Sequence, residues 1–203
     1  MTSDMPNDET RRAPDRERQI DRRRLLGGAL ALGAAGRLIG PAAAATDPRK
    51  APPQAGDQLV FAQGERKGQV VRPEDLPLGG PQQLAFPKDP ATDTIRDGSR
   101  LNQIALIRLD PDDLTEETRK SAADGVVAYA ATCSHQGCPV SMWKSANSTL
   151  YCSCHGTEFD PGDAAKVVKG PAPRRLASLP LTIDEGILIA AGPFTGRVGP
   201  QKG

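Results

Sequence analysis

The chain has 203 residues, a formal net charge of +1, 19 prolines and 21 glycines. The near-zero charge argues against a nucleic acid as the partner, because nucleic-acid binding needs an excess of basic residues. The length suffices for one domain after an N-terminal segment, and the many prolines and glycines favour turns over long helices, which is typical of an all-β fold.

The first 45 residues resemble a twin-arginine export signal. Residues 1–24 are polar and charged and end in Arg22, Arg23 and Arg24. A mildly apolar stretch rich in Gly and Ala follows, and residues 42–45 are alanines suited to cleavage. We therefore expect a signal peptide over residues 1–45, exported by the twin-arginine pathway, and a domain on the periplasmic side of the membrane.

The alternative for this segment is an N-terminal membrane anchor. Residues 25–45 are nominally long enough, because about 20 residues span a bilayer. Arg37 interrupts them, at a cost of roughly 2.5–3.5 kcal/mol if it sat at the bilayer centre. A cleaved signal is therefore favoured, although membrane association through this segment stays open. Both alternatives place the domain outside the cytoplasm.

The rest of the chain predicts a linker, one domain and a short tail. Residues 46–56 are rich in Pro and Ala and predict the linker. The domain is expected over residues 57–197 and the tail over residues 198–203. Apolar runs of strand length are found at residues 58–62, 102–109, 125–132 and 148–152.

Two further segments predict local structure. Apolar residues occupy alternate positions at Leu179, Leu181 and Ile183, and a turn is expected at 184–186. An apolar run resumes at residue 187, so these segments predict a β-hairpin. Polar residues 110–125 predict one or two helical turns. For these turns we expect Asp112 or Asp113 as the N-cap and Gly125 as the stop.

Two short boxes contain every cysteine and histidine of the chain. They are "CSHQGC", with Cys133, His135 and Cys138, and "CSCHG", with Cys152, Cys154 and His155. Six such ligands exceed what a four-coordinate site uses. A [2Fe–2S] cluster with two thiolates on one iron and two imidazoles on the other needs two Cys and two His. The two remaining thiols would form a disulfide in an oxidising compartment.

Other chemistries fit the boxes less well. Zinc sites usually pair Cys with Cys and His with His, whereas each box mixes the two types. Two structural disulfides would leave both histidines without a role. A nucleophilic cysteine needs a thiolate beside a histidine base, and four clustered cysteines that can oxidise one another are poorly suited to this.

The boxes resemble those of Rieske [2Fe–2S] proteins, Cys-x-His-x-Gly-Cys and Cys-x-Cys-His-x-Ser. The match is complete until the last position, where Thr157 replaces Ser. The resemblance implies that Cys133 and Cys152 bind one iron, that His135 and His155 bind the other, and that Cys138 and Cys154 form a disulfide. It also implies the fold of these proteins, a small antiparallel β sandwich with a cluster-binding subdomain built from two loops at its tip.

Neighbouring residues set the expected properties of the cluster. The segment Gly170-Pro171-Ala172-Pro173 resembles the proline-rich loop that lies against the cluster in the cytochrome bc family. In that family a Ser hydroxyl donates to a bridging sulfide and a Tyr hydroxyl donates to a ligand sulfur. Thr157 can replace the Ser, but Phe159 occupies the Tyr position and has no hydroxyl. Donors to sulfur stabilise the reduced cluster, so we expect a lower potential than in quinol-oxidising relatives.

The resemblance implies an electron carrier with one [2Fe–2S] cluster, and two functions are compatible with it. The first is a subunit that passes electrons from a catalytic oxidoreductase subunit to a c-type cytochrome, similar to the small Rieske subunit of arsenite oxidase. The second is the Rieske subunit of a cytochrome bc1-type complex, with cytochrome b as partner and quinol as substrate. A cytosolic Rieske ferredoxin is a weaker third, because it lacks the extra cysteines and an export signal.

The first function is favoured by two residues and by the cleavable signal. Phe159 lacks the hydroxyl described above. Gln136 stands between His135 and Gly137 of the first box, where bc-type proteins usually have Leu on the tip that docks onto cytochrome b. A polar amide at that position weakens the docking surface.

Overall fold

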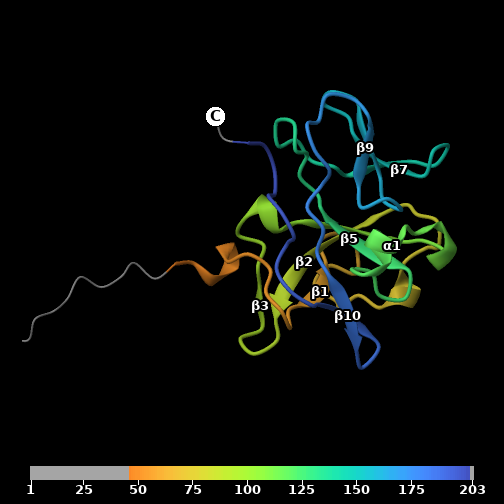
Figure 1. Cartoon of the computed structure of the whole chain (residues 1–203). Helices are drawn as coiled ribbons and strands as arrows, with labels where there is room; N and C mark the ends of the chain where they lie inside the picture. Colours follow the sequence, from red (N-terminus) through yellow and green to blue (C-terminus); the bar gives the residue numbers. More distant parts are fainter. Residues whose placement is uncertain (1–45, 202–203) are drawn as a thin grey trace, which may run out of the picture. The chain divides into compact units, whose positions relative to one another are not determined.

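The computed structural model describes residues 46–201, which form two antiparallel β-sheets (Figure 1). The larger sheet has the order β10-β11-β1-β2-β4-β5, and β3 pairs with β2. The smaller sheet has the order β6-β7-β8-β9. These antiparallel sheets confirm the predicted all-β fold. The predicted signal over residues 1–45 lies outside the described residues.

The strands have two to seven residues, and the helical elements have three or four. The larger sheet contains β1 (Gln58–Phe61), β2 (Gln83–Asp89), β3 (Thr94–Ile95), β4 (Ile104–Arg108), β5 (Val126–Ala130), β10 (Leu181–Asp184) and β11 (Ile187–Ala190). The smaller sheet contains β6 (Met142–Lys144), β7 (Thr149–Cys152), β8 (Thr157–Asp160) and β9 (Lys166–Lys169). The helical elements are α1 (Glu116–Arg119) and the 3-10 turns η1 (Pro48–Lys50), η2 (Pro73–Asp75), η3 (Arg100–Asn102) and η4 (Pro111–Asp113).

Between residues 46 and 201, no helix is both long enough and apolar enough to cross a membrane.

Strands β4 and β5 are apolar on both faces because both faces are covered. Alternate side chains of a strand point to opposite faces. Ala105, Ile107, Val127 and Tyr129 belong to one core cluster, which also contains Cys133, Cys152 and Phe159. Ile104, Leu106, Val126 and Ala128 belong to a second cluster inside the larger sheet, together with residues of β1, β10 and β11. The face of the larger sheet that belongs to the first of these clusters therefore packs directly against residues of both boxes.

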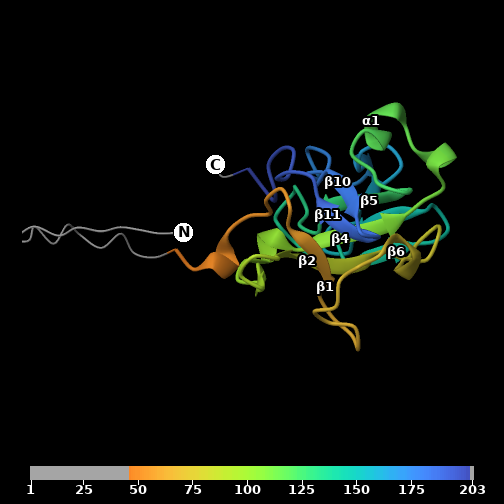
Figure 2. The same ribbon diagram turned by 90° about the horizontal axis from the view of Figure 1, so that it is seen from below.

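The strand predictions were largely confirmed, and Figure 2 shows β11, β1, β2 and β4 next to one another. All four apolar runs are strands, and the C-terminal hairpin forms with a turn at Glu185-Gly186. Several strands were not predicted. In β2, Pro87 interrupts the apolar pattern and lacks a backbone donor, yet its carbonyl accepts from the Arg96 amide at 2.8 Å. In β8 three of the four residues are polar, and in β9 two lysines flank two valines, so neither segment has the apolar run that predicts a strand.

The predicted helix caps were wrong. Asp110 caps η4, since its carboxylate accepts from the Asp112 amide at 3.0 Å, and Pro111 occupies the first position of the turn. Thr115 caps α1 and accepts from the Thr118 amide at 3.3 Å. Gly125 does not stop a helix. It lies in the turn before β5 with φ +72°, where a Cβ would clash with the Leu109 carbonyl oxygen.

Helix α1 fixes the turn between β8 and β9 to the larger sheet. The Thr118 hydroxyl donates to the Gly162 carbonyl at 2.9 Å and accepts from the Ala164 amide at 2.8 Å. From β5, the Tyr129 hydroxyl donates to the Pro161 carbonyl at 2.7 Å. Burial raises the pKa of Tyr129 and keeps it a donor. These buried bonds set the position of the smaller sheet.

The predicted linker is bound to the domain. The Gly56 amide donates to the Ala190 carbonyl at 2.9 Å, and the Asn102 side chain donates to the Ala51 carbonyl at 2.7 Å. The Arg49 carbonyl accepts from the Gly98 amide at 2.9 Å. Composition predicts only that residues 46–56 lack regular strands. It does not show that the domain offers partners for their backbone groups.

A buried ion pair joins the start of β1 to the chain after β3. Arg96 donates twice to the Asp57 carboxylate, at 2.8 and 3.0 Å. The two residues are only 5% and 3% exposed. Both charges are removed from water, so Asp57 depends on Arg96 for compensation, whereas Arg96 also lies 3.7 Å from the Asp89 carboxylate.

Replacing Arg96 by Leu should therefore lower the free energy of unfolding by about 3–5 kcal/mol, because Asp57 is left buried without its partner. Urea unfolding followed by circular dichroism measures this change. Arg49→Leu is the matched control, since it breaks the exposed Arg49–Asp97 pair and should have a much smaller effect. Equal losses in the two variants would contradict a special role of the buried pair.

Candidate metal centre

The two boxes form loops with the same backbone geometry. In the first box, which follows β5, the Gly137 amide donates to the Cys133 carbonyl at 3.0 Å. In the second box, between β7 and β8, the Gly156 amide donates to the Cys152 carbonyl at 3.1 Å. Both glycines have a left-handed conformation, with φ +76° and φ +71°. Each loop therefore closes four residues after its first cysteine, which lies at the end of a core strand or just beyond it.

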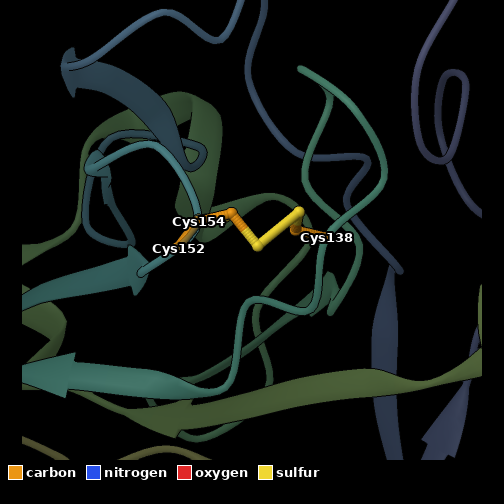
Figure 3. A group of neighbouring side chains, drawn as sticks. All are labelled: Cys138, Cys152 and Cys154. Atoms are coloured by element: carbon orange, nitrogen blue, oxygen red, sulfur yellow. A yellow bond between two sulfur atoms is a disulfide. The ribbon is translucent and has the colours of Figure 1, made fainter.

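The structure brings the predicted site residues together at the tip of the molecule. Cys138 and Cys154 are joined by a disulfide between the two loops, with their Cα atoms 6.5 Å apart (Figure 3). The sulfur atoms of Cys138, Cys152 and Cys154 lie within 4.8 Å of one another. The rings of His135 and His155 meet edge to face, with centroids 4.7 Å apart. The disulfide that the resemblance implies is thus present.

The remaining cysteines are free, buried thiols. Cys133 and Cys152 are each 1% exposed and belong to the core cluster beneath the tip. Burial raises the pKa of the Cys133 thiol. A metal that takes the place of the proton would compensate the burial of the thiolate. Because Cys138 and Cys154 are oxidised, the three neighbouring sulfurs cannot act as three thiolate ligands.

Two buried polar atoms at the tip fit a [2Fe–2S] cluster. Within the described residues, His135 Nδ1 and Thr157 Oγ1 are buried and have no hydrogen-bond partner. Buried polar atoms normally have one, so each needs an explanation. An imidazole nitrogen can bind iron, and a hydroxyl can donate to a sulfur of the cluster. Together with two free thiols and a second imidazole, this donor set suits the cluster.

The Pro-rich loop lies against the second box, as the resemblance implies. Gly170 has φ +94°, and a Cβ there would lie 2.6 Å from the Thr157 Cα and 2.9 Å from the Gly156 carbonyl oxygen. Ala172 is buried in the core cluster, whereas Pro171 and Pro173 are exposed. Only a glycine allows the chain to approach the second box this closely.

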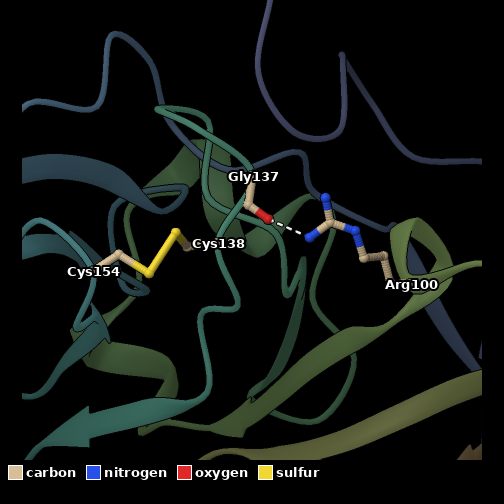
Figure 4. Close-up of a disulfide and its surroundings, with 4 residues drawn as sticks. All are labelled: Arg100, Gly137, Cys138 and Cys154. Carbon is tan, nitrogen blue, oxygen red and sulfur yellow. Dashed lines mark hydrogen bonds between the residues drawn. A yellow bond between two sulfur atoms is a disulfide. The ribbon is translucent and has the colours of Figure 1, made fainter.

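The first box is held by residues that sequence analysis did not identify. The Arg100 guanidinium donates to the Gly137 carbonyl at 2.6 Å, next to the disulfide (Figure 4). The Ser134 hydroxyl donates to the Arg174 carbonyl at 2.5 Å. Ser134 could have been suspected from its place between Cys133 and His135. The two arginines lie far from the boxes in sequence and carry no motif.

The described part of the predicted tail also contacts the first box. Arg174 donates to the carbonyl of Gly199. A Cβ on Gly137 would lie 3.1 Å from the Pro200 Cδ, and one on Gly199 would lie 3.3 Å from the Thr132 methyl group. Residues 199 and 200 of the predicted tail therefore pack against the first box.

Phe159 and Gln136 occupy different environments. Phe159 is 0% exposed, pairs with Leu150 across the smaller sheet and shares the core cluster with Cys133 and Cys152. Gln136 is exposed at the tip. The residue that lacks a hydroxyl thus lies beneath the site, and the polar amide lies on the surface that a partner would meet.

The opposite face of the smaller sheet carries a polar network that sequence analysis missed. Glu158 is buried and accepts from the Lys144 ammonium at 2.6 Å and from the Asn147 amide at 3.2 Å. The hydrogen bond from Lys144 holds the pKa of Glu158 below its usual range. Lys169 lies 3.7 Å from the same carboxylate. The network ties β6, β8 and β9 together behind the second box.

Comparison with known proteins identifies the family. The family model of the Rieske [2Fe-2S] domain matches residues 77–180, which is half of the chain. The chain is 36% identical over 147 residues to the cytochrome bc1 complex Rieske iron-sulfur subunit of Mycobacterium tuberculosis, covering 64% of this chain and 34% of that protein. It is 51% identical over 77 residues to a putative respiratory nitrate reductase subunit Rieske of Haloferax mediterranei, covering 37% of this chain and 34% of that protein.

The chain thus spans about a third of the length of these two relatives. Among solved structures, it is similar to the plasma membrane Rieske protein PetC3 of Synechocystis PCC 6803, with 24% identity and a TM-score of 0.35 over 54% of this chain and 84% of that one. The chain belongs to the Rieske [2Fe–2S] family. It carries one [2Fe–2S] cluster.

Gly170→Ala should displace the Pro-rich loop and make the cluster more accessible to solvent. The added methyl group would clash with Thr157 and Gly156, so the visible absorption of the loaded protein should bleach several-fold faster in air. Gly196→Ala is the matched control, because Gly196 also has φ +94° but a Cβ added there would have nothing within 4 Å. Similar bleaching rates in both variants would show that the strain of placing alanine in a left-handed backbone conformation, rather than the clash with Thr157 and Gly156, exposes the cluster.

Removing the disulfide in the double variant Cys138→Ala/Cys154→Ala should lower the free energy of unfolding by about 3 kcal/mol. The bond spans 16 residues and restricts the unfolded chain. Chemical unfolding measures the loss. A reductant should destabilise the wild-type protein towards the level of the variant and leave the variant unchanged. A variant as stable as the wild type would contradict this expectation.

Proposed function

We propose that this chain is an exported subunit that carries one electron at a time from a catalytic oxidoreductase subunit to a respiratory acceptor such as a c-type cytochrome. The observation that carries this proposal is the buried Phe159 beneath the predicted ligands. When bound, the cluster supplies reversible one-electron chemistry at a potential of roughly −150 to +300 mV. Without a hydroxyl at residue 159, the chain offers one donor fewer to the reduced cluster.

The predicted ligands are Cys133, Cys152, His135 and His155, and their burial supports a direction for electron transfer. The two thiols lie in the core, whereas His135 is half-buried and His155 is exposed. The chain therefore shields the thiolate side of the site and leaves the imidazole side open. A partner that binds over the histidines comes nearest to the cluster.

The disulfide supports export. Disulfides persist in oxidising compartments and are rare in the cytosol. The bond between Cys138 and Cys154 therefore agrees with a periplasmic location of the domain. The twin-arginine pathway, which is proposed from residues 1–45, would export the domain already folded around its cofactor.

The second candidate is the Rieske subunit of a cytochrome bc1-type complex. The observation that favours it is the 36% identity to the bc1 subunit of Mycobacterium tuberculosis. In this case the partner would be cytochrome b and the substrate quinol. The exposed Gln136 argues against it, because a polar side chain would have to be desolvated on docking.

Purification from native membranes and periplasm tests the two functions against each other. Under the first proposal, the chain fractionates with a catalytic oxidoreductase subunit. Under the second, it fractionates with cytochrome b. Electron paramagnetic resonance of the reduced protein tests the cluster in both cases, and a spectrum without a Rieske-type signal would refute both.

Phe159→Tyr should raise the midpoint potential. A net hydrogen bond of about 1 kcal/mol to the reduced cluster corresponds to roughly 40 mV for one electron. A redox titration followed by electron paramagnetic resonance measures the shift. Phe61→Tyr is the control, because Phe61 is also buried but belongs to the second core cluster, away from the boxes. An unchanged potential in Phe159→Tyr would remove the main argument for the first function.

A further inference from the structure

The tip of the molecule is built from segments without acidic residues. Residues 131–157, 167–183 and 187–201 contain no aspartate or glutamate, although the whole chain has 25 acidic residues. These segments include both boxes, the Pro-rich loop and the described part of the tail. The neighbouring Glu158 is buried behind the second box and bound by Lys144. The charges on the surface of the tip are therefore basic.

Three arginines gather beside the first box, and we name them the arginine surface: Arg100, Arg174 and Arg197. Arg100 donates to the Gly137 carbonyl at 2.6 Å (Figure 4). Arg174 donates to the Arg197 carbonyl at 2.8 Å, which holds the chain around Arg197 beside the box. Arg100 and Arg197 are exposed and Arg174 is half-buried. Backbone carbonyls thus position two guanidinium groups and leave their other donors free.

The arginine surface is not neutralised within residues 46–201. None of its three members lies within 4.0 Å of a described carboxylate oxygen. The adjacent Arg175 differs, because it pairs with Glu117 at 2.6 Å. Asp97, the acidic residue nearest to Arg100 in sequence, pairs with Arg49 at 2.7 Å. Uncompensated charges held in place next to a redox site attract a partner of opposite charge.

We propose that the arginine surface docks an acidic face of the protein that exchanges electrons with the cluster. This inference rests on the proposed electron-carrier function and adds the kind of partner. The surface lies beside the loop that carries His135, so a protein bound to it covers the open imidazole side of the site. Arginine suits this role, because its planar guanidinium pairs with carboxylates through two donors.

The test compares two oxidants of the reduced, cluster-loaded chain in a stopped-flow spectrometer: an acidic and a basic c-type cytochrome. The wild type should reduce the acidic cytochrome faster, and this rate should fall as salt is added. In Arg100→Gln/Arg197→Gln the ratio of the acidic to the basic rate should fall by about tenfold at low salt. The ratio is decisive, because a changed cluster potential affects both oxidants alike.

The control variant Lys67→Gln/Arg72→Gln removes two positive charges elsewhere. Lys67 lies in the turn after β1, and Arg72 reaches the Gly186 carbonyl at the β10–β11 turn, which Figure 1 shows at the opposite end from β7 and β9. In this control variant, the ratio of the acidic to the basic rate should stay at the wild-type value. Arg197→Gln alone provides a second test, because no side-chain hydrogen bond or ion pair of Arg197 would be lost among the described residues. It should lower the ratio about half as far on a logarithmic scale.

An unchanged ratio in Arg100→Gln/Arg197→Gln, with the cluster present, would overturn the proposal. An anionic lipid membrane is the alternative occupant of the arginine surface, and sedimentation with phosphatidylglycerol vesicles tests it. If the double variant loses vesicle binding and keeps the wild-type ratio, the surface binds lipid and the proposal is wrong. Absence of the Rieske-type signal from the wild-type protein would instead refute the electron-carrier function itself, so the two failures are distinguishable.

Discussion

The bond between Cys138 and Cys154 is the constraint on which the site depends. The first box follows β5 of the larger sheet, and the second joins β7 to β8 of the smaller one. Each box is closed by its own glycine amide, and those backbone bonds lie within each loop. The disulfide and the shared core beneath it determine how the two halves of the donor set face each other. Other restraints around the site, such as the close approach of Gly170 to Thr157, act on two loops that the disulfide already joins.

The candidate donor residues could be proposed from the sequence because cofactor chemistry restricts the types and spacing of residues within short segments. Strands such as β4 and β5 were predictable for a related reason, since burial on both faces gives a continuous apolar run. The smaller sheet was harder. Glu158 can be buried in β8 because Lys144 pairs with its carboxylate and the Asn147 amide donates to it. A charged residue in a short segment does not reveal such partners.

The tail shows a second limit of sequence analysis. Residues 198–203 have no apolar pattern, and the sequence predicts only a short tail. In the structure Arg174 binds the Gly199 carbonyl, and Pro200 packs near Gly137. These contacts arise because the first box leaves a surface that a chain segment can cover. They use backbone groups, which every residue has, so no residue type in the sequence indicates them. Only the three-dimensional arrangement identifies them.

Two features of the tip act on different parts of electron transfer. Phe159 lies in the core, and its proposed effect concerns the energy of the electron on the cluster rather than the surface. Arg100 and Arg197 are exposed, and the proposed docking concerns the encounter with a partner. If buried and exposed positions of one scaffold control potential and partner separately, as proposed, members of the family can serve different complexes with the same kind of cluster. Similarity to a bc1 subunit and to a nitrate reductase subunit therefore supports a shared cofactor more strongly than a shared partner.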